Sequence, residues 1–433
     1  MSIKTRRTLF YCLTALFLIL GTLTVLYSRG IRLDHGGFGI IRTGGIYISS
    51  QPEGASIFLD GKKQENKSGI LQRGTLISNL LPGDHELLVS QEGYLDWKKN
   101  TVVKSGEVSV FDSVVLLSNA EAQVFRAGRF ENFDFINGHL VLESSAGITL
   151  DEATVRGDEI VSLTDSGSLI TRDNNTNSFY LTSNLTPEDS LDLTALFNNL
   201  KENRLELSGY VQPLQILLAS NNDRWLYVIT KRAIYLMDVR KPDLELLALD
   251  YANLNHQRDN ILIWTKEGVV YNFNPTFHNQ GQPLVLEGTG INEPELARIA
   301  KFNDGWLFLD KTGELKYYTN ILELLATGVS AFELSSADNR IAIIKSGGEL
   351  YIRDFDTGVE INGLGKGVNQ VGWYKDAAHV FVLEGQQLYF RDITRDMPIN
   401  SHKLADGVPE FIYDREEQFV LTLTDEGIMK IPL

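Results

Sequence analysis

A pattern of two short apolar strands around a turn recurs along the C-terminal part of the chain, and this repeat constrains the fold most strongly. From Trp225 onward, successive copies start 36, 45, 35, 39 and 39 residues apart. A period near forty with paired short strands is typical of propeller blades. We therefore expect residues 121–433 to form a β-propeller of about seven blades. The seven copies start at Ile160, Trp225, Ile261, Trp306, Ile341, Val380 and Phe419.

Three details of the repeat bear on how such a propeller is built. The segment His139–Glu143 resembles an eighth, partial copy, so a count of eight is the alternative. The last copy stops at Leu433, soon after its second strand, and an N-terminal strand at Ala122–Phe125 or Phe133–Ile136 is expected to complete its sheet. The 65-residue gap from Ile160 to Trp225 must hold an insertion, which we interpret as a loop with room for one helix.

An aspartate recurs within the repeat at a nearly fixed distance from the start of a copy. It lies thirteen residues after the start at Asp173, Asp238 and Asp354, and twelve after it at Asp392. A functional interpretation is a ring of carboxylates that binds a cation or a basic ligand. We favour the alternative, in which each aspartate accepts backbone N–H groups in a turn or pairs with a neighbouring arginine. Arginines precede three of the four, at positions 172, 353 and 391.

One copy carries a more specific resemblance. The segments Ser335–Arg340, Gly348–Tyr351 and Asp354–Gly358 together resemble a blade of TolB-type and WD-like propellers. The Trp-Asp dipeptide is absent, so membership of the strict WD family is not indicated. The resemblance implies a rigid β-propeller and does not imply any catalytic residue.

Residues 44–117 are expected to form a small β-sandwich, because alternating strands are separated by strong turn signals. Pro52 and Gly54 suit a tight turn, and Asp60-Gly61 is a hairpin signal. The stretch 29–43 is rich in glycine and is expected to be a flexible stalk.

The turn motifs of this sandwich resemble the PEGA domain family of prokaryotic envelope proteins. The matching segments keep the family's order and spacing, although Thr75-Leu76 stands where the family often has Thr-Pro. The resemblance implies a spacing or binding module at the envelope and carries no catalytic residues. The matching segments are Ser50–Ala55, Leu59–Lys62, Leu80–Gly83 and Gly93-Tyr94.

Residues Leu9–Tyr27 form an uncharged, mostly apolar run of nineteen residues near the N-terminus. As a helix this run spans about 28 Å, which is close to the hydrocarbon thickness of a bilayer. Lys4, Arg6 and Arg7 precede it, so the positive-inside rule favours a cytoplasmic N-terminus and an exported body. We interpret residues 1–28 as a cytoplasmic tip and an uncleaved anchor; a cleaved signal peptide and a buried helix are the alternatives.

Composition excludes several classes of function. The net charge of −16, with scattered basic residues, argues against a nucleic-acid partner. Cys12 is the only cysteine, so an intrachain disulfide and a cysteine-based zinc site are ruled out. We expect no metal, no cofactor and no catalytic residues. The histidines are scattered, at positions 35, 85, 139, 256, 278, 379 and 402.

Two further patterns resemble binding sites. Asp173, Asn175 and Asn177 match the first ligands of a calcium loop, but Ser178 and Asn184 stand where Gly and Glu are needed, so a polar hairpin turn is favoured. Tryptophans 225, 264, 306 and 373 suggest a sugar-stacking platform, yet strand positions favour burial between blades for the first three. Trp97 and Tyr94 are expected to be exposed aromatics.

These features together predict an anchored, extracytoplasmic binding or scaffolding protein of the prokaryotic cell envelope, which is not an enzyme. Its partners would be the lipid bilayer, through Leu9–Tyr27, and an envelope protein or glycan. Two alternatives are an envelope assembly factor similar to TolB and a hydrolase or lyase that acts on polysaccharide or peptide. The enzyme alternative requires two acidic side chains about 5–10 Å apart at the central channel.

Overall fold

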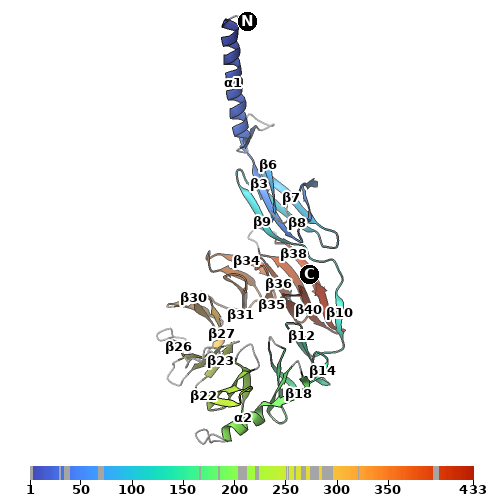
Figure 1. Cartoon of the computed structure of the whole chain (residues 1–433), viewed down its shortest axis with the longest axis vertical. Helices are drawn as coiled ribbons and strands as arrows, with labels where there is room; N and C mark the ends of the chain where they lie inside the picture. The colour runs from blue at the N-terminus through green and yellow to red at the C-terminus, as the bar shows by residue number, and fades with distance from the viewer. Residues whose placement is uncertain are drawn as a thin grey trace. The chain divides into compact units, whose positions relative to one another are not determined.

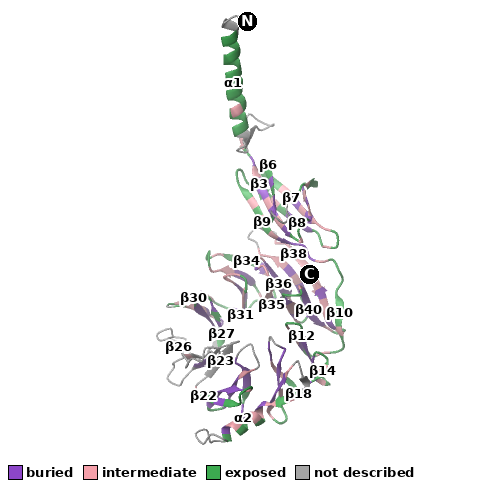
Figure 2. Ribbon diagram, viewed as in Figure 1, coloured by how far each residue is buried: buried purple, intermediate pink, exposed green. Residues whose placement is uncertain are grey.

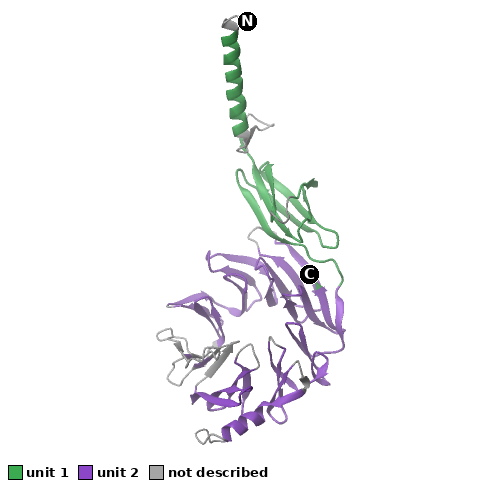
Figure 3. Ribbon diagram, viewed as in Figure 1, with its two compact units in different colours: residues 1–121, 432–433 green, residues 122–431 purple. Residues whose placement is uncertain are grey.

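The computed structural model divides the chain into two compact units, which are residues Met1–Glu121 with Pro432–Leu433, and residues Ala122–Ile431 (Figure 3). The structure describes residues 3–28, 31–33, 40–66, 73–164, 167–183, 186–202, 212–219, 224–249, 251, 253–257, 260–264, 270–273, 282–284, 296–319, 321–393 and 399–433.

The N-terminal apolar run forms helix α1, Ile3–Ser28 (Figure 1). Its segment Arg6–Val25 has a mean hydropathy of 2.0 and is long enough to cross a bilayer, and none of it is buried against the rest of the protein. This exposure argues against a helix buried in a soluble core. Length and composition fit both a membrane anchor and a signal sequence.

Two facing sheets form the small β-sandwich of the first unit, with strand orders β6-β3-β9 and β5-β4-β7-β8. A short antiparallel hairpin, β1 with β2, precedes it within the stretch expected to be a flexible stalk. The strands of this unit are β1 Ile31–Leu33, β2 Ile40–Arg42, β3 Gly44–Gln51, β4 Ser56–Leu59, β5 Lys62–Gln64, β6 Thr75–Leu80, β7 Gly83–Ser90, β8 Trp97–Val103 and β9 Val108–Val115.

Alternation along these strands decides which side chains fill the sandwich. Ile46 and Ile48 of β3 are fully buried, and they share a core with Leu87 and Val89 of the opposite sheet. The turns follow the sequence signals: Asp60 and Gly61 both have positive φ, of 50° and 73°, which suits a type I′ hairpin turn. Gly54 has φ +83°, and the Gln51–Pro52 peptide bond before it is cis.

Within the described residues, the second unit contains eight four-stranded antiparallel sheets, which are the blades of the propeller (Figure 1). The first four sheets are β11 Asn132–Ile136, β12 His139–Ser144, β13 Gly147–Leu150, β14 Ala153–Thr154; β15 Glu159–Leu163, β16 Leu169–Asp173, β17 Ser178–Ser183, β18 Thr186–Asp192; β19 Gln215–Leu218, β20 Trp225–Ile229, β21 Ala233–Asp238, β22 Asp243–Leu249; and β23 Asn253–Gln257, β24 Asn260–Trp264, β25 Val270–Phe273, β26 Gln282–Leu284.

Sheets five to seven follow the same plan, and the eighth takes one strand from the other end of the unit. Their strands are β27 Leu296–Phe302, β28 Gly305–Asp310, β29 Leu315–Tyr318, β30 Leu322–Ala326; β31 Val329–Leu334, β32 Arg340–Lys345, β33 Leu350–Asp354, β34 Glu360–Gly365; β35 Val368–Trp373, β36 His379–Glu384, β37 Gln387–Asp392, β38 Ser401–Asp406; and β39 Phe411–Asp414, β40 Phe419–Thr424, β41 Gly427–Pro432 with β10 Gln123–Ala127.

The second strand of a sheet carries successive buried apolar residues, as in residues 341–344 of β32, because both faces of the sheet are covered (Figure 2). In β32, Ile341 and Ile343 pack with side chains of the fifth sheet, whereas Ala342 and Ile344 pack with side chains of the seventh. A strand buried on both faces reads as a continuous apolar run. The packing of each sheet on the next therefore explains the repeat seen in the sequence.

The eighth sheet is completed from the N-terminal side, as the sequence predicted. Strand β10 pairs antiparallel with β41, and the innermost strands β11 and β39 of the first and last sheets are in contact. Three aromatic rings join these elements: Phe135 and Phe419 have centroids 5.6 Å apart, and Phe125 of β10 lies 6.3 and 6.4 Å from them. Lys430 lies over the Phe419 ring at 3.9 Å.

The count is thus eight sheets, the alternative that the sequence left open beside seven. The partial copy at His139–Glu143 belongs to a complete sheet, β11–β14. The copy that starts at Ile160 is out of phase: Ile160 lies in the first strand of its sheet, whereas Trp225 and the later starts lie in second strands. The expected insertion contains strand β18 and helix α2, Leu193–Glu202, which packs on β17 and β22.

Gly427 gives a test of this closure. Its φ is +134°, and a Cβ there would overlap the carbonyl oxygen of Arg126 in β10. We expect Gly427→Ala to lower the free energy of unfolding by about 3 kcal/mol, because the added methyl group overlaps the Arg126 carbonyl oxygen and the positive φ is strained for alanine. We also expect it to release β10 from β41. Hydrogen exchange at residues 123–127, together with thermal unfolding, measures this.

The matched control is Gly385→Ala. Gly385 also has a positive φ, of +60°, but a Cβ there meets open space. Strain alone is expected to cost about 1 kcal/mol, with β10 still protected from exchange. Equal protection of β10 in both variants would contradict the closure described here.

Candidate functional site

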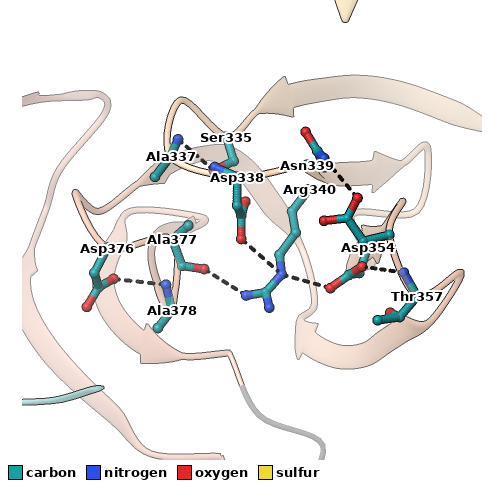
Figure 4. A network of polar contacts seen from close by, with 11 residues as sticks. Ser335, Ala337, Asp338, Asn339, Arg340, Asp354, Thr357, Asp376, Ala377 and Ala378 are labelled. Carbon is teal, nitrogen blue, oxygen red and sulfur yellow. Dashed lines mark hydrogen bonds and ion pairs between the residues drawn. The ribbon is translucent and has the colours of Figure 1, made fainter. Parts of the chain in front are cut away.

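A network of polar contacts lies at one end of the sixth and seventh sheets, around Arg340 at the start of β32 (Figure 4). Its Nε lies 3.2 Å from Oδ2 of both Asp338 and Asp354. Its Nη1 donates to the carbonyl oxygen of Ala377 in the next sheet at 3.1 Å. One guanidinium therefore fixes two turns of its own sheet and joins them to a turn of the neighbouring sheet.

Side chains also fix the backbone of the turns in this network. Ser335 Oγ accepts the backbone N–H groups of residues 337 and 338, both at 3.2 Å. Asp354 Oδ1 accepts the Thr357 N–H at 2.9 Å, and Asn339 Nδ2 donates to Asp356 Oδ1 at 2.8 Å (Figure 4). Turns held by such local bonds present a preformed surface.

Arg415 extends the network to the eighth sheet. Its Nη1 donates to Ser336 Oγ at 2.7 Å, and its Nη2 donates to the carbonyl oxygen of Lys375 at 3.1 Å. Three consecutive sheets are thereby connected at one end. We call this surface the Arg340 loop face; it comprises the turns 335–339, 355–359, 374–378 and 415–418.

The recurring aspartates take structural positions rather than forming one carboxylate ring. Asp238, Asp354 and Asp392 end third strands, whereas Asp173 ends a second strand. Asp238 is almost fully buried; burial would raise the pKa of this carboxyl, but hydrogen bonds from Arg224 and from backbone N–H groups hold it below its usual value.

The partner of each of these third-strand aspartates is a basic residue before or at the start of the second strand. Arg224 pairs with Asp238 and Arg340 with Asp354, each fourteen residues earlier in the chain. The arginine directly before the aspartate binds elsewhere: Arg353 pairs with glutamates 323 and 360, and Arg391 with Glu384. Of the two structural roles expected for these aspartates, acceptance of backbone N–H groups is confirmed at Asp173, Asp238 and Asp354, whereas the adjacent arginines pair elsewhere. The spacing of the real partners is visible in the sequence.

His379 takes the basic position in the seventh sheet. Its Nδ1 lies 2.8 Å from Asp376 and its Nε2 lies 3.3 Å from Asp392, and the ring stacks on Phe390 at 4.9 Å. Burial favours the neutral imidazole, but hydrogen bonds and the charges of the two carboxylates raise the pKa of His379 to about 9. The scattered histidines gave no sign of this arrangement, which joins Asp376 in the turn before β36 to Asp392 at the end of β37.

The calcium-like segment forms the polar turn that the sequence favoured. Asp173 Oδ1 accepts the N–H groups of residues 175 and 176, at 2.9 and 3.1 Å. Asn177 Oδ1 accepts from Arg172, and Asn184 lies outside the described residues. In the part of the chain that the structure describes, no group of three His, Cys, Asp or Glu residues is placed to hold a metal ion.

The tryptophans do not form a common platform. Trp306 is buried, and Trp373 donates from Nε1 to the carbonyl oxygen of Glu333 in the preceding sheet at 3.1 Å. Trp225 is half-buried, and the side chain of Trp264 lies outside the described residues. The expectation for Trp97 was wrong: its side chain is buried against Phe111, because position 97 points into the sandwich.

Asp134 and Glu410 form an acidic pair where the first and last sheets meet. Asp134 is in the innermost strand β11, and Glu410 directly precedes the innermost strand β39, which contacts β11. Burial raises the pKa of Asp134; burial and then the charge of Asp134 raise that of Glu410. One carboxyl on an innermost strand and one directly before the next innermost strand keep the enzyme alternative testable.

Comparison with known proteins identifies the small sandwich. The model of the family described as "PEGA domain" matches residues 43–115. This part of the chain is a PEGA domain. The match coincides with the sandwich strands β3–β9, so the family's turn motifs sit at the turns described above. The chain matches no curated protein.

Several solved structures are similar to about seven tenths of this chain. The computationally designed Ika8 protein is 14% identical, with a TM-score of 0.46, over 72% of this chain and 98% of that one. BamB from Moraxella catarrhalis is 11% identical, with a TM-score of 0.43, over 72% and 99%. PorZ of the type-IX secretion system of Porphyromonas gingivalis is 11% identical, with a TM-score of 0.39, over 69% and 42%.

The raised pKa of His379 predicts a loss of stability at alkaline pH. The charged imidazole is stabilised in the folded state, so its contribution is complete below its ordinary pKa of 6.5 and is lost as pH rises through about 9. Chemical unfolding should show a decline of up to ~3 kcal/mol over this range, and His379→Gln should abolish it.

His402→Gln is the control, because burial lowers the pKa of that histidine. Its contribution has the opposite sign and is lost as pH falls, so the variant should leave the alkaline decline intact. An alkaline decline that persists in His379→Gln would contradict the assignment.

The acidic pair predicts a gain of stability on neutralisation. A carboxyl with a raised folded-state pKa destabilises the fold once pH rises through that pKa. Asp134→Asn and Glu410→Gln should each raise the thermal midpoint at pH 7.5 and have little effect at pH 4. Exposed Glu416→Gln is the matched control. A lower midpoint at pH 7.5 in both variants would show that the charges are needed.

Proposed function

We propose that this chain is a membrane-anchored, extracytoplasmic binding or scaffolding protein of the prokaryotic cell envelope. The order of its parts supports this proposal: an apolar helix long enough to span a bilayer, then a PEGA domain, then a propeller. A PEGA domain that lies in the chain between an apolar helix and a rigid propeller is suited to act as an envelope spacer.

The Arg340 loop face is the surface that we propose for partner binding. Its turns are fixed by their own hydrogen bonds, so a partner would bind them without an ordering cost. Ser336, Asp356 and Glu417 are exposed on three different turns of this face. Fixed polar groups spread over three sheets suit a protein or glycan partner better than a small substrate.

The surface can be tested by site-specific photo-crosslinking in intact cells. A photoreactive residue at Ser336, Asp356 or Glu417 should crosslink to one envelope partner. The control positions are Glu349 and Gln386, which are exposed in the turns at the opposite end of the same sheets. Equal crosslinking at both ends, or none at either, would reject this face.

The nature of the crosslinked partner separates the alternatives. A polysaccharide adduct would indicate glycan binding, and an outer-membrane or secretory protein would favour an assembly role. Cleavage of the partner that depends on Asp134 and Glu410 would favour the enzyme alternative. Export is tested separately, because protease added to cells with a permeable outer layer should cut residues 44–433 if they are extracytoplasmic.

A further inference from the structure

The PEGA domain lies in the covalent path between the helix and the propeller, and its two terminal strands are direct neighbours. The path begins in β3 at Gly44 and leaves through β9 at Val115. These strands are parallel, with Gly45 opposite Val108 and Gln51 opposite Val115. The remaining strands of the domain lie between these two strands in the sequence.

Parallel pairing of the terminal strands determines how a pull would act on the domain. The start of β3 and the end of β9 lie at opposite ends of one ladder, about 20 Å apart at ~3.3 Å per residue. Tension between them therefore runs along the strands. The inter-strand hydrogen bonds are then strained together, whereas a pull across the strands would break them one after another.

The backbone is fastened where the path begins. The Arg42 carbonyl accepts from Ser105 Oγ at 3.0 Å, and the Thr43 carbonyl accepts from the Gly106 N–H at 3.2 Å. The Gly45 N–H donates to the carbonyl of Glu107 at 3.0 Å. The β8–β9 turn thus holds the first residues of β3.

A second set of bonds fastens the end of the path. The Leu116 N–H donates to the Gln51 carbonyl at 2.8 Å, and the Leu117 carbonyl accepts from Leu95 at 2.8 Å. The Asn119 N–H donates to the Gly93 carbonyl at 3.1 Å. This gives the Gly93-Tyr94 turn a physical role, because it holds the chain after β9.

Side chains cover the ladder on both faces. Ile46 and Ile48 lie beneath it in the core. On the outer face, Leu76, Tyr47 and Val110 are opposite one another across the three strands, although Leu76 and Val110 remain 51% and 58% exposed. Apolar side chains above and below shield backbone hydrogen bonds from competing water. These side chains form an apolar row on the outer face of the sheet, which also carries the half-exposed Val108.

We propose that the PEGA domain is a mechanical clamp, which transmits tension between the membrane helix and a propeller held by its partner without unfolding. The biological setting rests on the proposed anchored binding function. The mechanical property itself depends only on the parallel β3–β9 ladder and on the bonds that fasten its two ends.

Single-molecule pulling on the full chain in detergent micelles tests this clamp. Cys12, the only cysteine, is first replaced by serine. Handles attached at Arg42→Cys and Asn119→Cys apply tension along the strands of the β3–β9 ladder. Handles on Glu53→Cys and Asn119→Cys share one attachment but pull the adjacent ends of β3 and β9 apart. All three handle positions are exposed.

We expect a several-fold higher unfolding force for the lengthwise pair, with release of roughly 250 Å of chain in one step. Equal forces in the two geometries, or a weaker lengthwise pair, would overturn the proposal. The handles bypass both the helix and the propeller, so this result does not depend on partner binding. Loss of crosslinking at the Arg340 loop face would reject the proposed function and leave the measured force unchanged.

Discussion

Burial of both faces of every sheet is the constraint on which the propeller depends. The apolar second strands cover each other in successive pairs, so a sheet with no neighbour on one side would expose a full face. A ring meets this demand only if the last sheet meets the first. The cluster of Phe133, Phe135 and Leu142 with Phe419 and Leu421 is where that meeting occurs. The closing strand β10 follows from the same demand, because without it the eighth sheet would have three strands.

Much of this fold could be predicted because two-sided burial leaves a strong periodic signal. The signal is weaker in the first sheet, whose third and fourth strands have four and two residues, so that sheet looked like a partial copy. It is misleading in the second sheet. There the copy that starts at Ile160 runs from the first strand of the sheet into the second, whereas the copies from Trp225 onward run from the second strand into the third. Local turn chemistry resembled the repeat, but strand pairing across the sheet decided the phase.

The candidate site could be predicted only in part, because its contacts join residues that are distant in the chain. The recurring aspartates were recognised as turn residues from the sequence. Their partners were not, since an arginine adjacent in sequence points to the opposite side of a strand. Arg340 reaches Asp354 because the two residues are paired across β32 and β33, and it reaches Ala377 because the next sheet packs alongside. Contacts between sheets, such as Arg415 with Ser336, leave no spacing signal at all.

The few residues between the PEGA domain and strand β10 link the mechanical stability of that domain to the closure of the propeller. The path from the PEGA domain reaches the propeller through the closing strand, only a few residues after the bond from Asn119 to Gly93. A pull that unfolded the PEGA domain would thus free the segment that precedes β10, whose pairing with β41 completes the eighth sheet. A clamp placed before the closing strand protects ring closure as well as the tether. A small domain with a parallel terminal pair thus stands in the chain between an apolar helix and a ring that is closed by its own N-terminal strand.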